Sequence, residues 1–375
     1  EASYLQELRG KEKEKESFKA LMEGRKLLKR KYGKVYVSIN RPFTLREIEG
    51  EDLKGQTLPE AISIWVIQKI NLTTMVTPYA LVSATILLLA LKGFPRQLLK
   101  ERLASLYDYL KYFDAILSDS LRNRDNLGEI EDTVIATFLE DKILEKLTFE
   151  GESPDGQDDG FFIIREENRP RIIFYKNSII NYFLPIAFYG TALLHLNKKG
   201  DITADAVFAG QRAIKELFSQ EFIYDPETDE TVRRNDRLLL DFLVSNSLIT
   251  LQDGRIAIEE RSVEVLQFFA RIIRDFLESY YVAASTIVTS RWKQVGKKEL
   301  TMEARKSGIK MYHTGDITLS ESLSLPNYNN AFAYLESHGW IRRKDVGKKQ
   351  PDYEIIAPEE IEKMRVAGRL TAEVL

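Results

Sequence analysis

Apolar residues recur at helical spacing along most of the chain, and this pattern predicts a mainly α-helical protein. The clearest case is residues 260–290, where apolar positions three or four residues apart predict one amphipathic helix. Helical spacing also covers much of residues 58–150, and shorter helices are predicted over 203–219, 233–247 and 327–337. Strands are expected to be few and short.

Two of the predicted helices are each followed by a predicted hairpin, which is typical of the end of a winged-helix unit. The first hairpin turns at Asp253-Gly254, a strong signal for a two-residue turn. The second covers residues 340–356 and turns across a Lys- and Gly-containing loop. Winged-helix-like elements are therefore expected at 233–258 and 327–356, although no sequence repeat of fixed period is visible.

A single β-rich run lies near the start of the chain. Residues 1–31 predict a highly charged helix, and Val35–Asn40 then reads as a short buried strand that ends at Arg41-Pro42. An isolated strand leaves its backbone groups unpaired, and the rest of the chain predicts no series of strands to join it. We therefore expect its partner strands to lie upstream of residue 1.

These patterns predict four parts. Residues 1–50 are expected to be the tail of an upstream α/β domain, and residues 51–150 a helical region. Residues 151–174 are expected to form an acidic loop, followed by a short hairpin over Phe161–Phe174. Residues 175–375 are expected to form a C-terminal helical domain that contains both winged-helix-like elements.

Composition narrows the chemistry. The 375 residues contain no cysteine, which excludes disulfides, thiolate nucleophiles and zinc sites built on sulfur. The formal net charge of −3 provides no general attraction to nucleic acid or to anionic lipid, so either would need a local patch. The predicted helix at 327–337 carries no Lys or Arg for phosphate contacts, and no nucleic-acid partner is expected.

Two local patches are candidates for contact with a lipid surface. A basic cluster near the end of the first predicted helix suits anionic headgroups, phosphate or acyl-carrier protein: Arg25, Lys26, Lys29, Arg30, Lys31 and Lys34. An aromatic group in the apolar stretch 179–196 suits the membrane interface: Tyr182, Phe183, Phe188 and Tyr189. The simpler alternatives are a solvated helix end for the cluster and a buried helix for the stretch.

Several stretches resemble one enzyme family. These are Glu1–Ser17, Gly33–Leu45, Val76–Val82, Tyr175–Ile180 and Phe276–Tyr281. Together they resemble the glycerol-3-phosphate / dihydroxyacetone-phosphate acyltransferase family, in the region downstream of its catalytic blocks, over roughly residues 1–290. One departure is Ile39-Asn40-Arg41-Pro42, where the family usually has a turn like Phe-Gly-Glu-Pro.

The resemblance implies an acyl transfer in phospholipid synthesis. The parent protein would move an acyl group from acyl-CoA or acyl-carrier protein to the sn-1 hydroxyl of glycerol 3-phosphate, with dihydroxyacetone phosphate as the alternative acceptor. It would need no metal or redox cofactor, and it would work at a membrane, on the cytoplasmic side.

The same resemblance places the reactive groups outside this chain. The family uses a His-x4-Asp motif, and none of His195, His313 and His338 has an Asp five residues further on. No catalytic, cofactor-binding or metal-binding residue is therefore expected here, and the chain alone is expected to be inactive. The alternative of another class is a non-enzymatic helical scaffold or winged-helix binding module.

Overall fold

The computed structural model describes residues 34–49, 57–89, 93–147, 160–198, 200, 202–290, 292–344 and 352–374. The chain divides into two compact units, Glu1–Met75 and Val76–Leu375. The predicted helix over 1–31, the cluster residues Arg25, Lys26, Lys29, Arg30 and Lys31, and most of the acidic loop lie outside the described residues.

The described residues of the first unit form an extended segment and two helices, α3 (Leu45–Glu49) and α4 (Leu58–Thr73). Glu60 accepts a hydrogen bond from the Thr57 backbone N–H at 2.8 Å, which satisfies a donor at the start of α4. The predicted strand Val35–Asn40 pairs with no strand among the described residues. Its apolar residues Val35, Val37 and Ile39 are 82%, 79% and 90% exposed, so the described residues do not bury them.

The described residues of the second unit follow one order of elements three times: helix, strand, two helices, two strands, helix. In the second of these repeats the first strand is reduced to a single bridge. The first repeat consists of α5 (Pro78–Leu89), β1 (Gly93–Pro95), α6 (Arg96–Tyr112), α7 (Leu127–Glu140), β2 (Leu144–Leu147), β3 (Phe161–Ile164) and α8 (Arg169–Asn177). The second consists of α9 (Ile180–Asn197), α10 (Ala204–Leu217), α11 (Asp229–Ser245), β4 (Thr250–Gln252), β5 (Arg255–Ala257) and α12 (Glu260–Ala270). The third consists of α13 (Arg274–Ser290), β6 (Gln294–Gly296), α14 (Lys297–Thr314), α15 (Leu325–Ser337), β7 (Ile341–Lys344), β8 (Asp352–Ile355) and α16 (Pro358–Val374).

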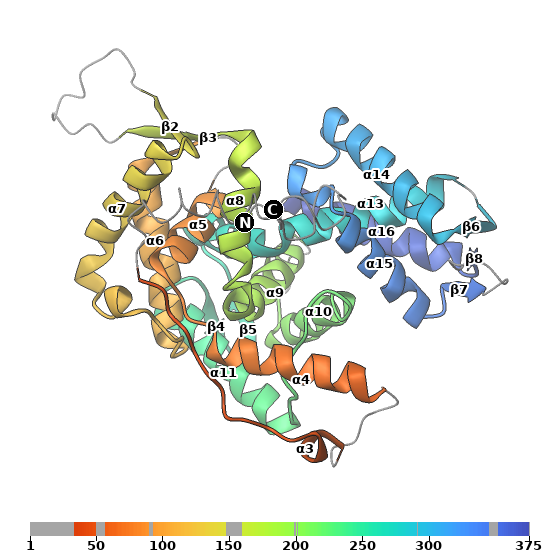
Figure 1. Ribbon diagram of the computed structural model, residues 1–375, viewed down its shortest axis with the longest axis horizontal. Helices are drawn as coiled ribbons and strands as arrows, with labels where there is room; N and C mark the ends of the chain where they lie inside the picture. The colour runs from red at the N-terminus through yellow and green to blue at the C-terminus, as the bar shows by residue number, and fades with distance from the viewer. Residues whose placement is uncertain are drawn as a thin grey trace, which may run out of the picture. The chain divides into compact units, whose positions relative to one another are not determined.

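Strand pairing has the same topology in the first and third repeats. The sheets have the orders β1-β3-β2 and β6-β8-β7, with antiparallel pairs throughout. In the second repeat β4 pairs with β5, and a single bridge from Thr203 to Arg255 stands where the first strand would be. The first and last helices of each repeat pack together, α5 on α8, α9 on α12 and α13 on α16. The second unit is therefore a tandem array of three winged-helix repeats (Figure 1).

The mainly helical fold class is confirmed, as are both predicted winged-helix-like ends. Asp253 and Gly254 both have positive φ, +48° and +75°, as the predicted turn requires. The first winged-helix repeat, at the start of the second unit, was not predicted.

Two local predictions are wrong. Residues 260–290 form α12 and α13 with a 3₁₀ turn at Arg271–Ile273 between them, because such a turn interrupts the helix without disturbing the apolar spacing. Phe161–Phe174 forms no hairpin of its own, because Phe161–Ile164 pairs instead with Leu144–Leu147. Pro170 stands in the first turn of α8, where its missing N–H costs no helical hydrogen bond.

Candidate functional site

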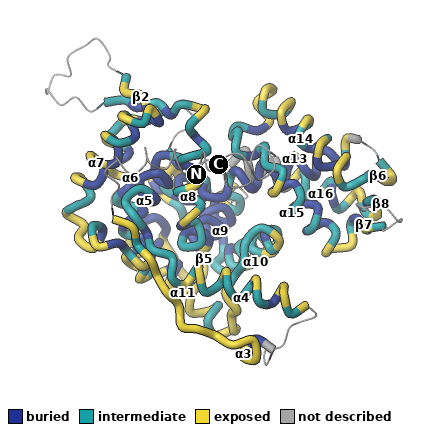
Figure 2. Tube along the Cα trace, in the orientation of Figure 1, coloured by how far each residue is buried: buried dark blue, intermediate teal, exposed yellow. Residues whose placement is uncertain are grey.

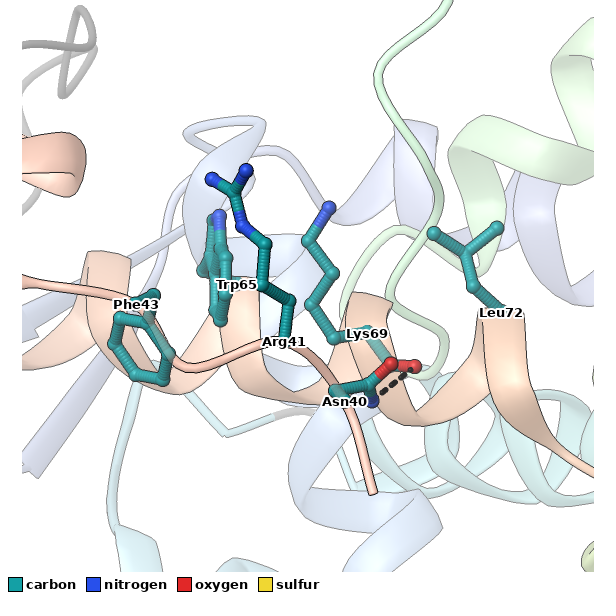
Figure 3. Close-up of a pocket in the computed structure, with 6 residues that line it drawn as sticks. All are labelled: Asn40, Arg41, Phe43, Trp65, Lys69 and Leu72. Carbon is teal, nitrogen blue, oxygen red and sulfur yellow. Dashed lines mark hydrogen bonds between the residues drawn. The ribbon is translucent and has the colours of Figure 1, made fainter. Parts of the chain in front are cut away.

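A pocket of about 330 Å³ lies within the first unit, between the extended segment and α4 (Figure 3). It is lined by Asn40, Arg41, Phe43, Trp65, Lys69 and Leu72. Trp65 and Lys69 are four residues apart on α4 and therefore share one face of the helix.

The pocket combines aromatic rings with cations. The rings of Phe43 and Trp65 are 4.1 Å apart between centroids, and the Lys69 ammonium lies 5.0 Å from the centre of the Trp65 ring. The Arg41 guanidinium rises beside Trp65 on the same side as Lys69 (Figure 3). Glu47 partly offsets Arg41 through an exposed ion pair of 3.4 Å.

Asn40 and Arg41 are two of the positions where the chain departs from the Phe-Gly-Glu-Pro-like turn. Asn40 Nδ2 donates to the Lys69 carbonyl at 3.2 Å and to Thr73 Oγ1 at 3.3 Å, which fastens the extended segment to α4. A glycine could not make these bonds. The departure thus helps to build this pocket.

The chemistry of the pocket is binding rather than catalysis. Its six lining residues include two cations, and none is a His, Asp or Glu that would serve as a general base. Arg and Lys beside an apolar wall suit an anionic group attached to an apolar one. Sequence reasoning missed this pocket, and the only local signal was the four-residue spacing of Trp65 and Lys69.

A second group of charged side chains lies buried in the second unit. Lys176 of α8 pairs with Asp275 of α13 at 3.1 Å, and Arg169 of α8 pairs with Glu321 at 2.5 Å. All four side chains are less than a tenth exposed. Burial raises the pKa of Asp275, and the neighbouring Lys176 ammonium opposes that rise. These pairs join the first winged-helix repeat to the third.

Glu278 is the most fully bonded carboxylate of this group. It accepts hydrogen bonds from the backbone N–H groups of Thr318 and Leu319 and from the Ser322 hydroxyl, at 2.8–3.2 Å. Arg274 also donates to it at 3.1 Å. A carboxylate with so many donors is a structural anchor, because none of its lone pairs remains available to a substrate.

Glu221 differs from these groups because it forms no ion pair within the described part of the chain. Its carboxylate accepts a hydrogen bond from Asn330 of α15 at 3.0 Å. Burial raises the pKa of Glu221 to about 7, and the Asp275 charge adds to the rise. The contact joins the second repeat to the third.

The aromatic residues proposed for membrane contact lie on α9. Phe183, Phe188 and Tyr189 are at most 2% exposed, and they pack in the core. Tyr182 is partly buried, and its hydroxyl accepts a hydrogen bond from the Ile116 N–H at 3.4 Å. In this arrangement the three rings are enclosed by protein and face no lipid, and membrane contact through α9 stays a prediction.

No single helix among the described residues is long and apolar enough to cross a membrane. The segments Glu166–Asn177 and Ile180–Asn197 are long and apolar enough only when taken together, and a bend of 93° separates them. Of the predicted basic cluster, only Lys34 is described, and it is exposed.

Three of the stretches that carry the resemblance meet in space, namely Val76–Val82, Tyr175–Ile180 and Phe276–Tyr281. Tyr79 lies 6.0 Å from Tyr175 between ring centroids, and the Lys176 ammonium lies 5.5 Å from the centre of the Phe276 ring. Residues almost two hundred positions apart thus form one interior region. The residues of these three stretches pack against one another in the interior, and their contacts serve the structure.

Comparison with known proteins agrees with this resemblance. The family described as "Glycerol-3-phosphate acyltransferase C-terminal region" matches residues 4–344. The chain belongs to this family.

Relatives of the chain carry two names. It is 23% identical to a glycerol-3-phosphate acyltransferase of Glaesserella parasuis. The alignment of 376 residues covers 94% of this chain and 44% of the relative. It is 23% identical over 375 residues to a dihydroxyacetone phosphate acyltransferase of Oryctolagus cuniculus, covering 92% of this chain and 53% of the relative. It is also 23% identical to the dihydroxyacetone phosphate acyltransferase of Mus musculus, with 94% of this chain and 54% of the relative covered. The chain spans about half the length of these relatives.

The described residues of this family member hold no group of three or more His, Asp or Glu side chains placed to bind a metal ion. The two groups of polar residues that the structure does assemble are the cationic pocket of the first unit and the buried charges of the second. Partners in the buried group are as far as 152 residues apart, so no sequence motif could identify them.

Proposed function

We propose that this chain is the C-terminal part of an acyltransferase that esterifies the sn-1 hydroxyl of glycerol 3-phosphate for phospholipid synthesis. Dihydroxyacetone phosphate is the alternative acceptor, and acyl-CoA or acyl-carrier protein is the donor. The observation that carries the proposal is the family match over residues 4–344, in a chain half as long as its relatives.

In this proposal the groups that perform the reaction belong to an upstream part of the parent polypeptide. No His-x4-Asp motif occurs in this sequence, and the described pocket holds no general base. The acyl thioester and glycerol 3-phosphate would therefore bind mainly through that upstream part. The whole polypeptide would work at the cytoplasmic side of a membrane.

The extended segment supports such an arrangement. Val35, Val37 and Ile39 alternate along it and are almost fully exposed, as on one face of an unpaired strand. An exposed edge of this kind is a ready template for strand addition. We propose that it completes the sheet of the upstream catalytic domain.

The test is acyl transfer by two proteins. The purified 375-residue chain is expected to transfer no acyl group from acyl-CoA or acyl-carrier protein to either acceptor, whereas the parent polypeptide is expected to be active. Transfer by the 375-residue chain alone would overturn the placement of the reactive groups. The ratio of rates with the two acceptors, measured on the parent, decides between them.

A matched pair of substitutions in the parent tests the strand. Val37→Asp is expected to lower activity at least about tenfold, because a buried carboxylate disfavours sheet pairing. Val37→Thr keeps the branched shape that strands prefer and is expected to retain most activity. Equal activity of the two variants would contradict the proposed sheet contact.

The second candidate function is a scaffold without enzymatic activity, and the three winged-helix repeats favour it. Their buried charges hold elements together and leave no reactive group open. A parent polypeptide that shows no acyl transfer with either donor would favour this alternative.

A further inference from the structure

Helix α14, the second helix of the third repeat, has one face in the core and one in solvent. Leu300, Thr301, Ala304 and Gly308 are buried, and the helix packs on α13 and α15. The opposite face is exposed along its length (Figure 2). Packing in the core therefore explains the residues on only one face of this helix.

The exposed face has an apolar centre with cations on both sides. Met302 and Ile309 are 42% and 40% exposed, and their seven-residue separation places them on the same line along the helix. At 3.6 residues per turn, Lys298 and Arg305 flank this line on one side. On the other side lie Lys306 and Lys310, with the exposed Glu299 between them, and His313 lies close to the apolar line.

The charge of α14 is opposite to that of the chain. Its 18 residues contain five Lys or Arg and two Glu, whereas the whole chain has a net charge of −3. Lys306 pairs with Glu303 at 3.1 Å in an exposed ion pair. Within the described residues Lys298 and Lys310 have no ion-pair partner, so these cations remain available to an anionic surface.

The arrangement distinguishes between anionic partners. A winged helix that reads DNA places its third helix in the groove, and α15 contains no Lys or Arg. An apolar line between two rows of cations is instead the pattern of a helix that lies in a membrane interface, with its apolar side chains below the phosphates. Arg and Lys beside it would contact lipid phosphate oxygens.

We propose that this face of α14 docks the protein on an anionic phospholipid surface. Met302 and Ile309 enter the boundary between headgroups and acyl chains, and Lys298, Lys306 and Lys310 contact the phosphates. The inference rests on the proposed function, because an enzyme of phospholipid synthesis needs access to such a surface. It names a contact made by other residues than the basic cluster and the aromatic residues of α9.

Vesicle co-sedimentation of the purified 375-residue chain tests the proposal without any acyl transfer. We expect the chain to bind phosphatidylcholine vesicles that contain roughly a quarter phosphatidylglycerol. This binding should weaken steeply as the salt concentration rises. The triple variant Lys298→Glu/Lys306→Glu/Lys310→Glu is expected to bind at least about 100-fold more weakly. The variant Met302→Ser/Ile309→Ser, which leaves the charge unchanged, is expected to lose about tenfold.

Helix α11 offers a matched control. Arg233, Arg234 and Arg237 are exposed there, and the triple change of these residues to Glu alters the net charge by the same amount. This variant is expected to bind vesicles within about threefold of the unchanged chain, because its cations do not flank the apolar line of α14. Circular dichroism verifies that all variants are folded.

Three outcomes would overturn the proposal: no vesicle binding by the unchanged chain, equal losses in the two triple variants, or full binding by Met302→Ser/Ile309→Ser. If the α14 triple variant lost binding to acidic acyl-carrier protein but kept binding to vesicles, the partner of this face would be a protein instead. Vesicle binding by an inactive parent polypeptide would overturn the proposed acyl transfer and leave this inference standing.

Discussion

The buried charges between α8 and α13 and the exposed charges of α14 use the same residue types in opposite environments. Lys176 and Asp275 are 7% and 8% exposed and bond to each other, whereas Lys298, Lys306 and Lys310 of α14 are exposed. A charge removed from water is tolerated only with a partner, so the buried set is committed to holding the repeats together. The exposed set contributes little to stability and remains free to bind. Position within the fold, not residue type, therefore separates structural from functional charge.

Loss of the Glu278 carboxylate is expected to have the largest effect. Glu278→Ala leaves the Thr318 and Leu319 N–H groups and Arg274 without their acceptor, and it should lower the free energy of unfolding by about 3–5 kcal/mol. Denaturant unfolding followed by circular dichroism measures this. Glu303→Ala on the exposed face of α14 is the control, and it should cost less than about 0.5 kcal/mol. Similar costs for the two variants would remove the distinction between the two environments.

The Lys176–Asp275 pair sharpens the comparison. Lys176→Met alone should destabilise the chain by about 3 kcal/mol, because it leaves Asp275 buried without its cation. Adding Asp275→Leu should recover most of this loss, since an apolar pair of similar volume needs no mutual neutralisation. A double-mutant cycle of unfolding free energies measures the coupling, and additive losses would contradict it.

Replacing glycine by alanine compares the buried face of α14, at Gly308, with an open helical position, at Gly128. A Cβ at Gly308 would lie 2.5 Å from the Tyr328 hydroxyl and 2.9 Å from Leu323 Cδ2, so Gly308→Ala should cost about 1–3 kcal/mol. At Gly128 of α7 nothing lies within 4 Å of such an atom. Gly128→Ala should therefore be neutral or stabilise by up to about 1 kcal/mol, through its better helix propensity. Thermal unfolding of both variants measures the difference.

The smallest effect concerns Glu221, the buried carboxyl without a cation. Its pKa is raised by burial to about 7 in the folded chain, above its ordinary value of 4.5, so the folded state holds this proton more tightly than the unfolded state. Stability from this group is present below pH 4.5 and is lost as the pH rises to about 7. Glu221→Gln should therefore flatten the stability profile between these values by about 1–2 kcal/mol. An unchanged slope in denaturant unfolding at several pH values would show that Glu221 does not titrate in this way.

Local chemistry allowed part of the fold to be predicted. The hairpin at Asp253-Gly254 follows from turn residues that tolerate positive φ, and the helices follow from apolar spacing. The first repeat escaped prediction because β1 has only three residues and β2 is separated from β3 by a long acidic segment. Such strands are formed by pairing, which leaves little trace in any one of them.

The sites were harder to predict than the fold because they depend on distant residues. The pocket joins Asn40 and Phe43 to Trp65 and Lys69 across more than twenty residues, and Lys176 meets Asp275 across 99. The exposed face of α14 has a regular spacing in the sequence, but spacing alone does not reveal which face of the helix the core covers. Only packing against α13 and α15 decides that.

The three winged-helix repeats do not form an open chain of neighbours. Tyr109 of the first meets Phe242 of the second at 5.3 Å between ring centroids, Glu221 of the second meets Asn330 of the third, and Lys176 of the first meets Asp275 of the third. In a linear solenoid a terminal module can peel away while the others persist. Here each repeat contacts both of the others, so unfolding of any one repeat would expose apolar surface on the other two. The second unit should therefore melt in one concerted step and resist piecemeal proteolysis.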